Sequence, residues 1–144
     1  DYLMRANVVH GGYANRPEES TYAALTVDGS GQLMSGAKRY RLRFTPATIP
    51  PAGAFWSLIA YDLKTMSLIE NPIRRYSIGD RTPGLARNAD GSFDVFIQKD
   101  APATGTANWL PVADGPFMLI VRIYEPGQGV FDGSFKLPVL EVLD

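Results

Sequence analysis

Apolar and polar residues alternate along much of this chain with a period of two, the period of a β-strand. The segment Lys38–Thr45 shows it most clearly, since apolar Tyr40, Leu42 and Phe44 are separated by arginines. This pattern is typical of an antiparallel strand with one face in a core and the other in solvent. The same pattern, or a continuous apolar run, predicts further strands at Tyr22–Val27, Ala54–Asp62, Met66–Ile69, Phe93–Lys99, Pro116–Glu125 and Leu137–Leu143.

Turn-forming residues separate these segments. Prolines between Thr45 and Gly53 exclude a strand interior there. Asp-Gly pairs, which favour hairpins and tight loops, occur at Asp28-Gly29, Asp90-Gly91, Asp114-Gly115 and Asp132-Gly133. Only the opening segment Asp1–His10 favours a helix, because an aspartate can cap it and a Gly-Gly pair follows it.

The number of short strands and turns predicts an all-β fold, an antiparallel jelly-roll-like β-sandwich with a short N-terminal helix. No helical pattern separates the strands, which disfavours a parallel α/β fold. The length of 144 residues fits one domain. We expect residues 1–20 to form a helical or irregular lead-in and residues 21–144 to form the sandwich.

Composition narrows the function by exclusion. The chain has 14 Lys and Arg against 15 Asp and Glu, and a general nucleic-acid binder needs a much stronger basic excess. It has no cysteine, which excludes disulfides, thiolate zinc sites and cysteine nucleophiles. With one histidine and no apolar run long enough for a membrane span, the sequence predicts no metal, no cofactor, no nucleic-acid partner and no transmembrane segment.

The segment Arg74–Arg81 concentrates the polar chemistry of the chain. Arg75 and Arg81 are candidates for binding a carboxylate or phosphate in bidentate fashion, with Tyr76 donating a further hydrogen bond. The structural alternative is that Asp80 accepts hydrogen bonds from nearby backbone N–H groups while Arg81 holds the loop closed. Both interpretations stay open at this stage.

The two tryptophans differ in their surroundings. Trp56 lies inside an apolar strand, where a core position is expected. Trp109 lies next to Asn108 in a predicted loop, where its ring can pack against the core or stack on a sugar. Asn108 and Trp109 are therefore candidate ligand-binding residues.

Other polar patterns favour structural roles. The oxygen-bearing residues from Asn88 to Asp94 have the spacing of a calcium loop but lack its glycine and its bidentate glutamate, so a turn at Asp90-Gly91 explains them. His10 is the only imidazole, and no nucleophile elbow accompanies it. The stripe of Arg39, Arg41 and Arg43 is expected to be a solvated face, neutralised by acids on an adjoining strand.

Carboxylates near strand ends are candidates for the acid pair that glycoside hydrolysis requires. They are Asp62, Glu70, Asp80, Asp94 and Glu125.

Four motifs, taken in order, resemble a known bacterial family. They are Ala54–Leu58, Asn71–Leu85, Asn88–Ser92 and Ala107–Pro111. Together they resemble the domain-of-unknown-function family 1214, a module commonly C-terminal to one of family 1254. The resemblance implies a jelly-roll sandwich and a periplasmic or secreted location. It implies no established activity and no catalytic residues.

We therefore expect a non-catalytic binding or oligomerisation module whose partners are copies of itself or a preceding domain. One alternative is an enzyme, or half of one, that acts on a small anion or sugar through the Arg74–Arg81 loop. Another is a carbohydrate-binding module that uses Trp109. A pocket gathering Arg75, Tyr76, Asp80 and a second carboxylate would favour chemistry, whereas side chains bonded to backbone carbonyls would favour a scaffold.

Overall fold

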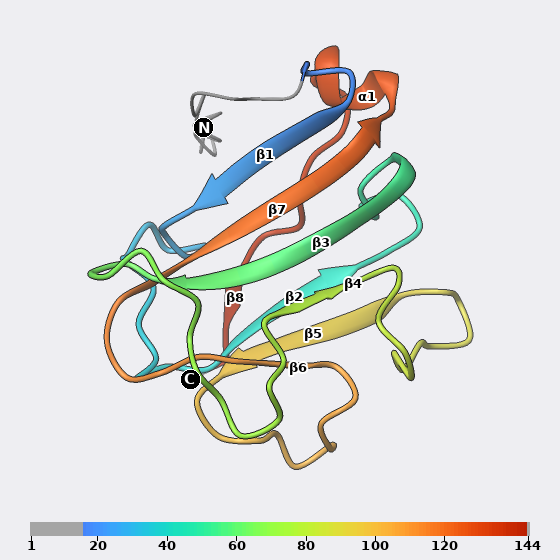
Figure 1. Ribbon diagram of the computed structural model, residues 1–144. Coiled ribbons are helices and arrows are strands. Elements are labelled where there is room, and N and C mark those ends of the chain that lie inside the picture. The colour runs from blue at the N-terminus through green and yellow to red at the C-terminus, as the bar shows by residue number, and fades with distance from the viewer. Residues whose placement is uncertain (1–15, 144) are drawn as a thin grey trace.

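Two β-sheets of four strands each lie face to face in the computed structural model, which describes residues 16–143 (Figure 1). The first sheet contains, in spatial order, β1 (Ser20–Leu25), β7 (Phe117–Pro126), β3 (Ala52–Asp62) and β4 (Ser77–Gly79). The second contains β6 (Trp109–Pro111), β5 (Phe93–Gln98), β2 (Tyr40–Phe44) and β8 (Glu141–Val142). Neighbouring strands are antiparallel except β5 and β6, which are parallel.

The all-β sandwich predicted from the alternating pattern is confirmed. The described residues contain one short helix, α1 (Gln128–Phe131), which follows β7. The helix expected at Asp1–His10 lies outside the described residues. Between residues 16 and 143, no helix has the length and apolar character needed to cross a lipid bilayer.

Two of the predicted strands differ in the structure: one is not a strand, and one is much shorter. The segment Met66–Ile69 is wrong as a strand, since it contributes only an isolated bridge to Tyr61. Of Leu137–Leu143, only the two residues of β8 pair with β2, because Pro138 has no N–H to donate to a ladder. Strands β4 and β6 were not predicted, because three residues are too few to show alternation.

The core lies between the sheets and is built from the apolar positions of the alternating pattern. Trp56 is 2% exposed, as its sequence setting predicted, and its ring packs against Phe44 with centroids 5.0 Å apart. Phe44 in turn stacks on Phe93 at 5.1 Å. Other fully buried side chains of the core are Tyr40, Leu42, Leu58, Val95, Ile97, Phe117, Leu119 and Val121. Each such side chain contributes roughly 1.5–3 kcal/mol by leaving water.

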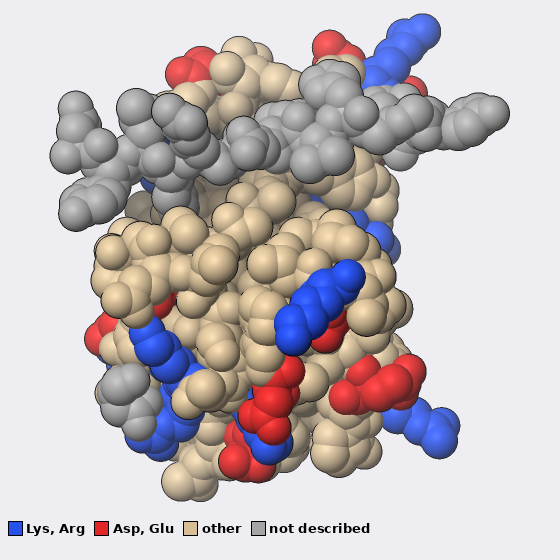
Figure 2. Space-filling model, turned by 90° about the vertical axis from the view of Figure 1, so that its left-hand side faces the viewer, with Lys and Arg blue, Asp and Glu red and all other residues tan. Residues whose placement is uncertain are grey.

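Two arginines of the stripe, Arg41 and Arg43 on β2, are paired with acids of the neighbouring strands, as expected. Arg41 donates to Glu141 of β8 at 2.7 Å, and Arg43 lies 3.7 Å from Asp94 of β5. The side of the molecule shown in Figure 2 likewise has basic and acidic groups next to one another, beside a broad area without charged residues.

The calcium-like spacing after Asn88 forms a closed turn. The N–H of Asn88 donates to the carbonyl of Ser92 at 2.7 Å, and Oδ1 of Asp90 accepts from the Ser92 N–H at 2.9 Å. The favoured turn interpretation is therefore confirmed. Among residues 16–143, no cluster of His, Asp and Glu is placed to hold a metal ion.

The outer face of the first sheet carries the positions that alternate with the core. Across β3 and β7, Phe55 is the partner of Tyr124 and Ser57 is the partner of Arg122. The rings of Phe55 and Tyr124 stack with centroids 4.3 Å apart. Because β4 lies at the edge beside β3, the loops on either side of β4 border this face (Figure 1).

Candidate functional site

An open groove of about 500 Å³ lies on this outer face, at the edge formed by β3 and β4. This volume falls within the range of about 300–1,000 Å³ that is usual for small-molecule sites. The residues that line the groove are Phe55, Trp56, Ser57, Ile73, Arg74, Arg75, Tyr76, Ser77, Gly79, Arg81, Thr82, Pro83 and Arg122.

The charge of the lining is of one sign. It includes four arginines, Arg74, Arg75, Arg81 and Arg122, and among the described lining residues there is no Asp or Glu. The ion pairs of residues 16–143 use other basic side chains. The groove is therefore a concentration of guanidinium groups without carboxylate counterions from the described part of the chain.

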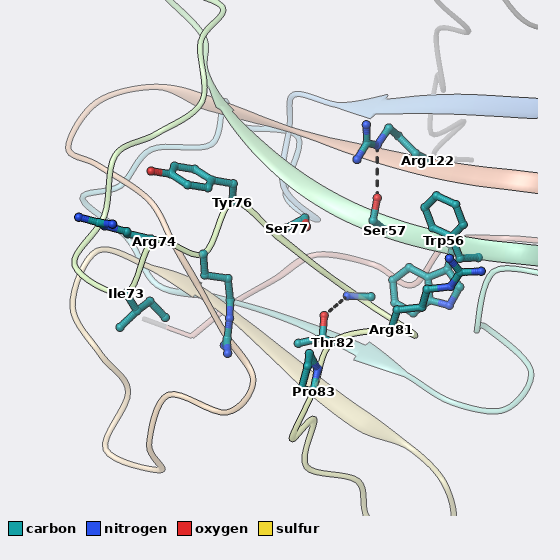
Figure 3. Close-up of a pocket in the computed structure, with 13 residues that line it drawn as sticks. Trp56, Ser57, Ile73, Arg74, Tyr76, Ser77, Arg81, Thr82, Pro83 and Arg122 are labelled. Carbon is teal, nitrogen blue, oxygen red and sulfur yellow. Dashed lines mark hydrogen bonds between the residues drawn. The ribbon is translucent and has the colours of Figure 1, made fainter.

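Arg122 comes from the middle of β7 and is half-buried on the outer face. Its Nε donates to Oγ of Ser57, the partner residue on β3, at 3.3 Å (Figure 3). A guanidinium has five N–H donors in a fixed plane. Because this bond uses only Nε, the two terminal amino groups of Arg122 stay available to a ligand.

Arg81 follows β4 and is held against the sheet by an aromatic ring. Its guanidinium carbon lies 4.5 Å from the centre of the Phe55 ring, a cation–π contact. One amino group also donates to the carbonyl of Ala54 at 3.2 Å. The structural alternative expected Arg81 to hold its own loop closed; the observed bond instead goes to Ala54 of β3, and the rest of its guanidinium borders the groove.

Arg75 acts as a brace between the two sheets. Its Nη1 donates to the carbonyl oxygens of Thr106, Ala107 and Trp109 at 2.5, 2.9 and 3.0 Å. These carbonyls belong to the loop before β6 and to β6 itself, in the second sheet. Arg75 was a candidate ligand-binding residue, and these bonds favour a scaffold role for it.

In the turn before β4, the consecutive residues Arg74 and Arg75 make different contacts. The side chain of Asn71 makes two bonds to the backbone of Arg75. Oδ1 of Asn71 accepts from the Arg75 N–H at 2.9 Å, and Nδ2 of Asn71 donates to the Arg75 carbonyl at 2.9 Å. Between them Arg74 takes a φ of 50°, in the left-handed region that non-glycine residues rarely occupy. While Arg75 binds carbonyls, Arg74 is exposed and lines the groove. Strain of this kind often occurs at functional sites.

Tyr76 and Asp80 are already bonded to other residues. The Tyr76 hydroxyl donates to Oε2 of Glu70 at 2.9 Å, and this bond raises the pKa of Tyr76. Oδ1 of Asp80 accepts from the backbone N–H of Trp56 at 3.1 Å. Asp80 therefore bonds to strand β3 and is not among the described residues that line the groove.

Asn108 and Trp109 lie away from the groove and are buried. The Asn108 side chain accepts from the Ala86 N–H at 2.7 Å and donates to the carbonyls of Ala86 and Asp94, both at 2.8 Å. Trp109 is 3% exposed, and its indole N–H donates to the Gln98 carbonyl at 2.9 Å. The exposed ring that sugar stacking requires is absent at Trp109, because β6 pairs with β5 and places this residue in the interior.

Sequence reasoning missed Arg122, Ser57 and Phe55 as groove residues. The signal for Arg122 was present, since it is the one charged residue between Phe117 and Tyr124 in an otherwise apolar strand. His10, the only imidazole of the chain, lies outside the described residues.

Comparisons with known proteins find one matching family and similar solved structures. The family model described as protein of unknown function (DUF1214) matches residues 19–128. The solved VPA0106 protein of Vibrio parahaemolyticus is similar at 28% identity and a TM-score of 0.81, over 93% of this chain and 33% of that one. An uncharacterised protein of Burkholderia cenocepacia, at 17% identity and a TM-score of 0.57 over 90% of this chain and 31% of that one, shows the fold alone.

The chain therefore spans about a third of the length of each of these two solved proteins. No protein with a curated description matches it.

Proposed function

Since this chain belongs to the DUF1214 family, whose members are proteins of unknown function, we propose a function from the groove itself: a non-catalytic module that binds small anionic ligands. The support for this proposal is the charge, burial and hydrogen bonding of the groove residues.

The observation that carries the proposal is the burial of Arg122 without a carboxylate partner from residues 16–143. It is half-buried on a sheet face, and within residues 16–143 it pairs with no carboxylate. A cation that loses part of its hydration is costly unless an opposite charge or several acceptors replace the water. An anionic ligand in the groove would supply that charge to the free amino groups of Arg122.

The other arginines extend the same chemistry around the groove. Arg81 presents the part of its guanidinium that is not bonded to Ala54, and Arg74 is exposed at the turn before β4. Guanidinium groups bind carboxylates and phosphates through two parallel N–H···O bonds. The lining thus offers many donors and few acceptors.

Binding is favoured over proton-transfer catalysis by the same set of residues. Carboxylates and imidazoles are the usual general acids and bases of enzymes. The described lining contains neither, and its one phenol, Tyr76, has its pKa raised by the bond to Glu70. Asp80, which the enzyme alternative placed beside the arginines, accepts from the Trp56 backbone N–H and is not among the described residues that line the groove.

The experiment is calorimetric titration of the purified domain with inorganic phosphate and with citrate at low ionic strength. Arg122→Ala should weaken binding about 10- to 100-fold, which corresponds to losing about 1.5–3 kcal/mol of charge-assisted hydrogen bonding. Arg122→Lys should also bind less tightly than the parent, because an ammonium cannot form the two parallel bonds.

Arg43→Ala is the matched control. It removes an arginine from β2 of the other sheet, with the same change in net charge, and should leave both affinities unchanged. Thermal unfolding followed by circular dichroism checks that each variant is folded. Equal binding by the parent, Arg122→Ala and Arg43→Ala, or no binding by the parent at all, would refute the proposed function.

A further inference from the structure

The arginines of the groove do not converge on one point. In Figure 3, Arg74 lies at one end of the lining and Arg81 at the opposite end, with Arg122 nearer to Arg81. A single phosphate or carboxylate is held best by guanidinium groups that meet around it. The separation seen here suits a ligand whose negative charges are themselves spaced apart.

Hydroxyl groups lie between the two ends. Figure 3 shows Ser57 and Ser77 between Arg74 and Arg81, with Thr82 at the border below them. Oγ of Ser57 accepts from Arg122, and Oγ1 of Thr82 accepts from the Gly79 N–H at 2.8 Å. A hydroxyl that accepts one bond still has its own hydrogen to donate. The middle of the groove therefore suits a ligand that carries oxygen atoms along its length.

At Gly79, the edge strand beside the groove offers no free backbone group to an added peptide strand. Strand addition needs free backbone N–H and C=O groups on an edge strand. On the edge strand β4, Thr82 takes up both groups of Gly79, since Oγ1 of Thr82 accepts from the Gly79 N–H and the Thr82 N–H donates to the Gly79 carbonyl at 3.1 Å. Because Gly79 cannot extend the sheet, we expect recognition in the groove to come mainly from side chains.

Taking the anion-binding function above as its basis, we propose that the ligand is an acidic oligosaccharide, a short chain of uronate sugars. One carboxylate binds Arg81 and Arg122, a second binds Arg74, and the hydroxyl and ring oxygens between them accept from Ser57 and Ser77. An open groove, unlike an enclosed pocket, lets such a chain pass through without a free end.

The test compares three sugars by calorimetry at fixed ionic strength: galacturonate, tetragalacturonate and fully methyl-esterified tetragalacturonate. The tetramer should bind about tenfold or more tightly than the monomer, since its second carboxylate binds from an already anchored chain. The methyl ester has the same sugar backbone without charge and should bind about tenfold or more weakly than the acid, as expected for losing a guanidinium–carboxylate pair.

Arg74→Gln separates the two ends of the groove. It keeps a polar but shorter side chain, removes one charge and should reduce the affinity for the tetramer to that for the monomer. Binding of the monomer, held by Arg81 and Arg122, should not change. Arg43→Ala, in the other sheet, should change neither affinity.

Several results would overturn the oligosaccharide proposal. Equal binding of monomer and tetramer, or an unchanged tetramer affinity in Arg74→Gln, would do so while leaving an anion site that depends on Arg122. If tetraglutamate bound as tightly as tetragalacturonate, the groove would recognise polyanions in general and not sugars in particular. Failure of phosphate and citrate to bind the parent domain would instead refute the proposed function beneath it.

Discussion

Gly79 of β4 lies so close to Trp56 of β3 that a Cβ atom at position 79 would stand 2.2 Å from the Trp56 carbonyl oxygen. Only glycine permits this approach, and it brings the edge strand into contact with the strand that supplies Phe55 and Ser57 to the groove. The floor of the groove therefore depends on a residue without a side chain.

Gly79→Ala should destabilise the domain. Inserting a methyl group against backbone typically costs about 1–3 kcal/mol, and here β4 would have to move away from β3. The measurement is the free energy of unfolding in urea. Ser77→Ala, on the same strand but at an exposed position, is the control and should lie within about 0.5 kcal/mol of the parent. Equal stabilities of the two variants would contradict the close contact.

Arg75→Ala should loosen the loop before β6. The change removes three hydrogen bonds from a charged donor, and we expect a loss of about 1–3 kcal/mol because the side chain is only partly exposed. Hydrogen exchange should show faster exchange of amides between residues 103 and 109, with amides of β7 little changed. Arg43→Ala, which removes an exposed arginine with one ion pair, is the comparison. If protection in the loop were unaffected, Arg75 would not be its brace.

Tyr76→Phe should leave anion binding nearly unchanged, within about a factor of two, because less than 0.5 kcal/mol is expected when the group removed makes no contact with the ligand. The hydroxyl donates to Glu70 and is not free for a ligand. The sequence-based expectation of a donating Tyr76 predicts a larger loss, so titration with citrate distinguishes the two.

The same pair gives a spectroscopic check. The bond to Glu70 raises the pKa of the Tyr76 phenol, so Glu70→Gln should lower that pKa toward its ordinary value of about 10. Titration of the labelled tyrosine ring by NMR measures it. A pKa that does not fall in Glu70→Gln would show that the bond is absent in solution.

Asp28 should make stability fall in acid. Burial alone raises its pKa, but hydrogen bonds from Ser30 and Gln32 outweigh burial and lower the pKa overall. A carboxyl whose pKa is lower in the folded state than in the unfolded state stabilises the fold fully at pH values above the unfolded pKa, about 3.9. This contribution is lost as the pH falls through the folded pKa. Melting temperatures measured from pH 7 down to about 2 should therefore drop less steeply below about pH 4 in Asp28→Asn than in the parent.

Ser30→Ala keeps the carboxyl but removes the 2.6 Å bond from the Ser30 hydroxyl. It should raise the folded-state pKa of Asp28 toward the unfolded value, so that less stability is lost as the pH falls and the loss is complete at a higher pH. An unchanged profile in both variants would mean that Asp28 does not contribute to the acid sensitivity.

The sequence predicted the strands that are long enough to show alternation of apolar and polar residues. Alternation in Lys38–Thr45 and Pro116–Glu125 identified β2 and β7, because a strand half-buried in a sandwich must place every second residue in the core. It could not identify β4 or β6, whose three residues show no period. Their position depends on distant contacts, such as the one between Arg75 and Trp109, 34 residues apart.

The candidate site was predicted only in part. The segment Arg74–Arg81 does border the groove, but its charges have different uses that no local pattern reveals. Arg75 binds carbonyls of the other sheet, and Arg122 joins the groove from a strand over 40 positions further along the chain. Self-association, a preceding domain of family 1254 and a periplasmic or secreted location stay predictions.

The carbonyl contacts of Arg75, beside the exposed Arg74, have a consequence for affinity. Neighbouring residues share one peptide unit, so the carbonyls that hold Arg75 also fix the backbone from which Arg74 extends. An incoming anion then needs to immobilise only one side chain, at about 0.5–1.5 kcal/mol, and not a whole loop. Most of the conformational entropy that ordering the groove costs is therefore lost when the chain folds, before a ligand binds.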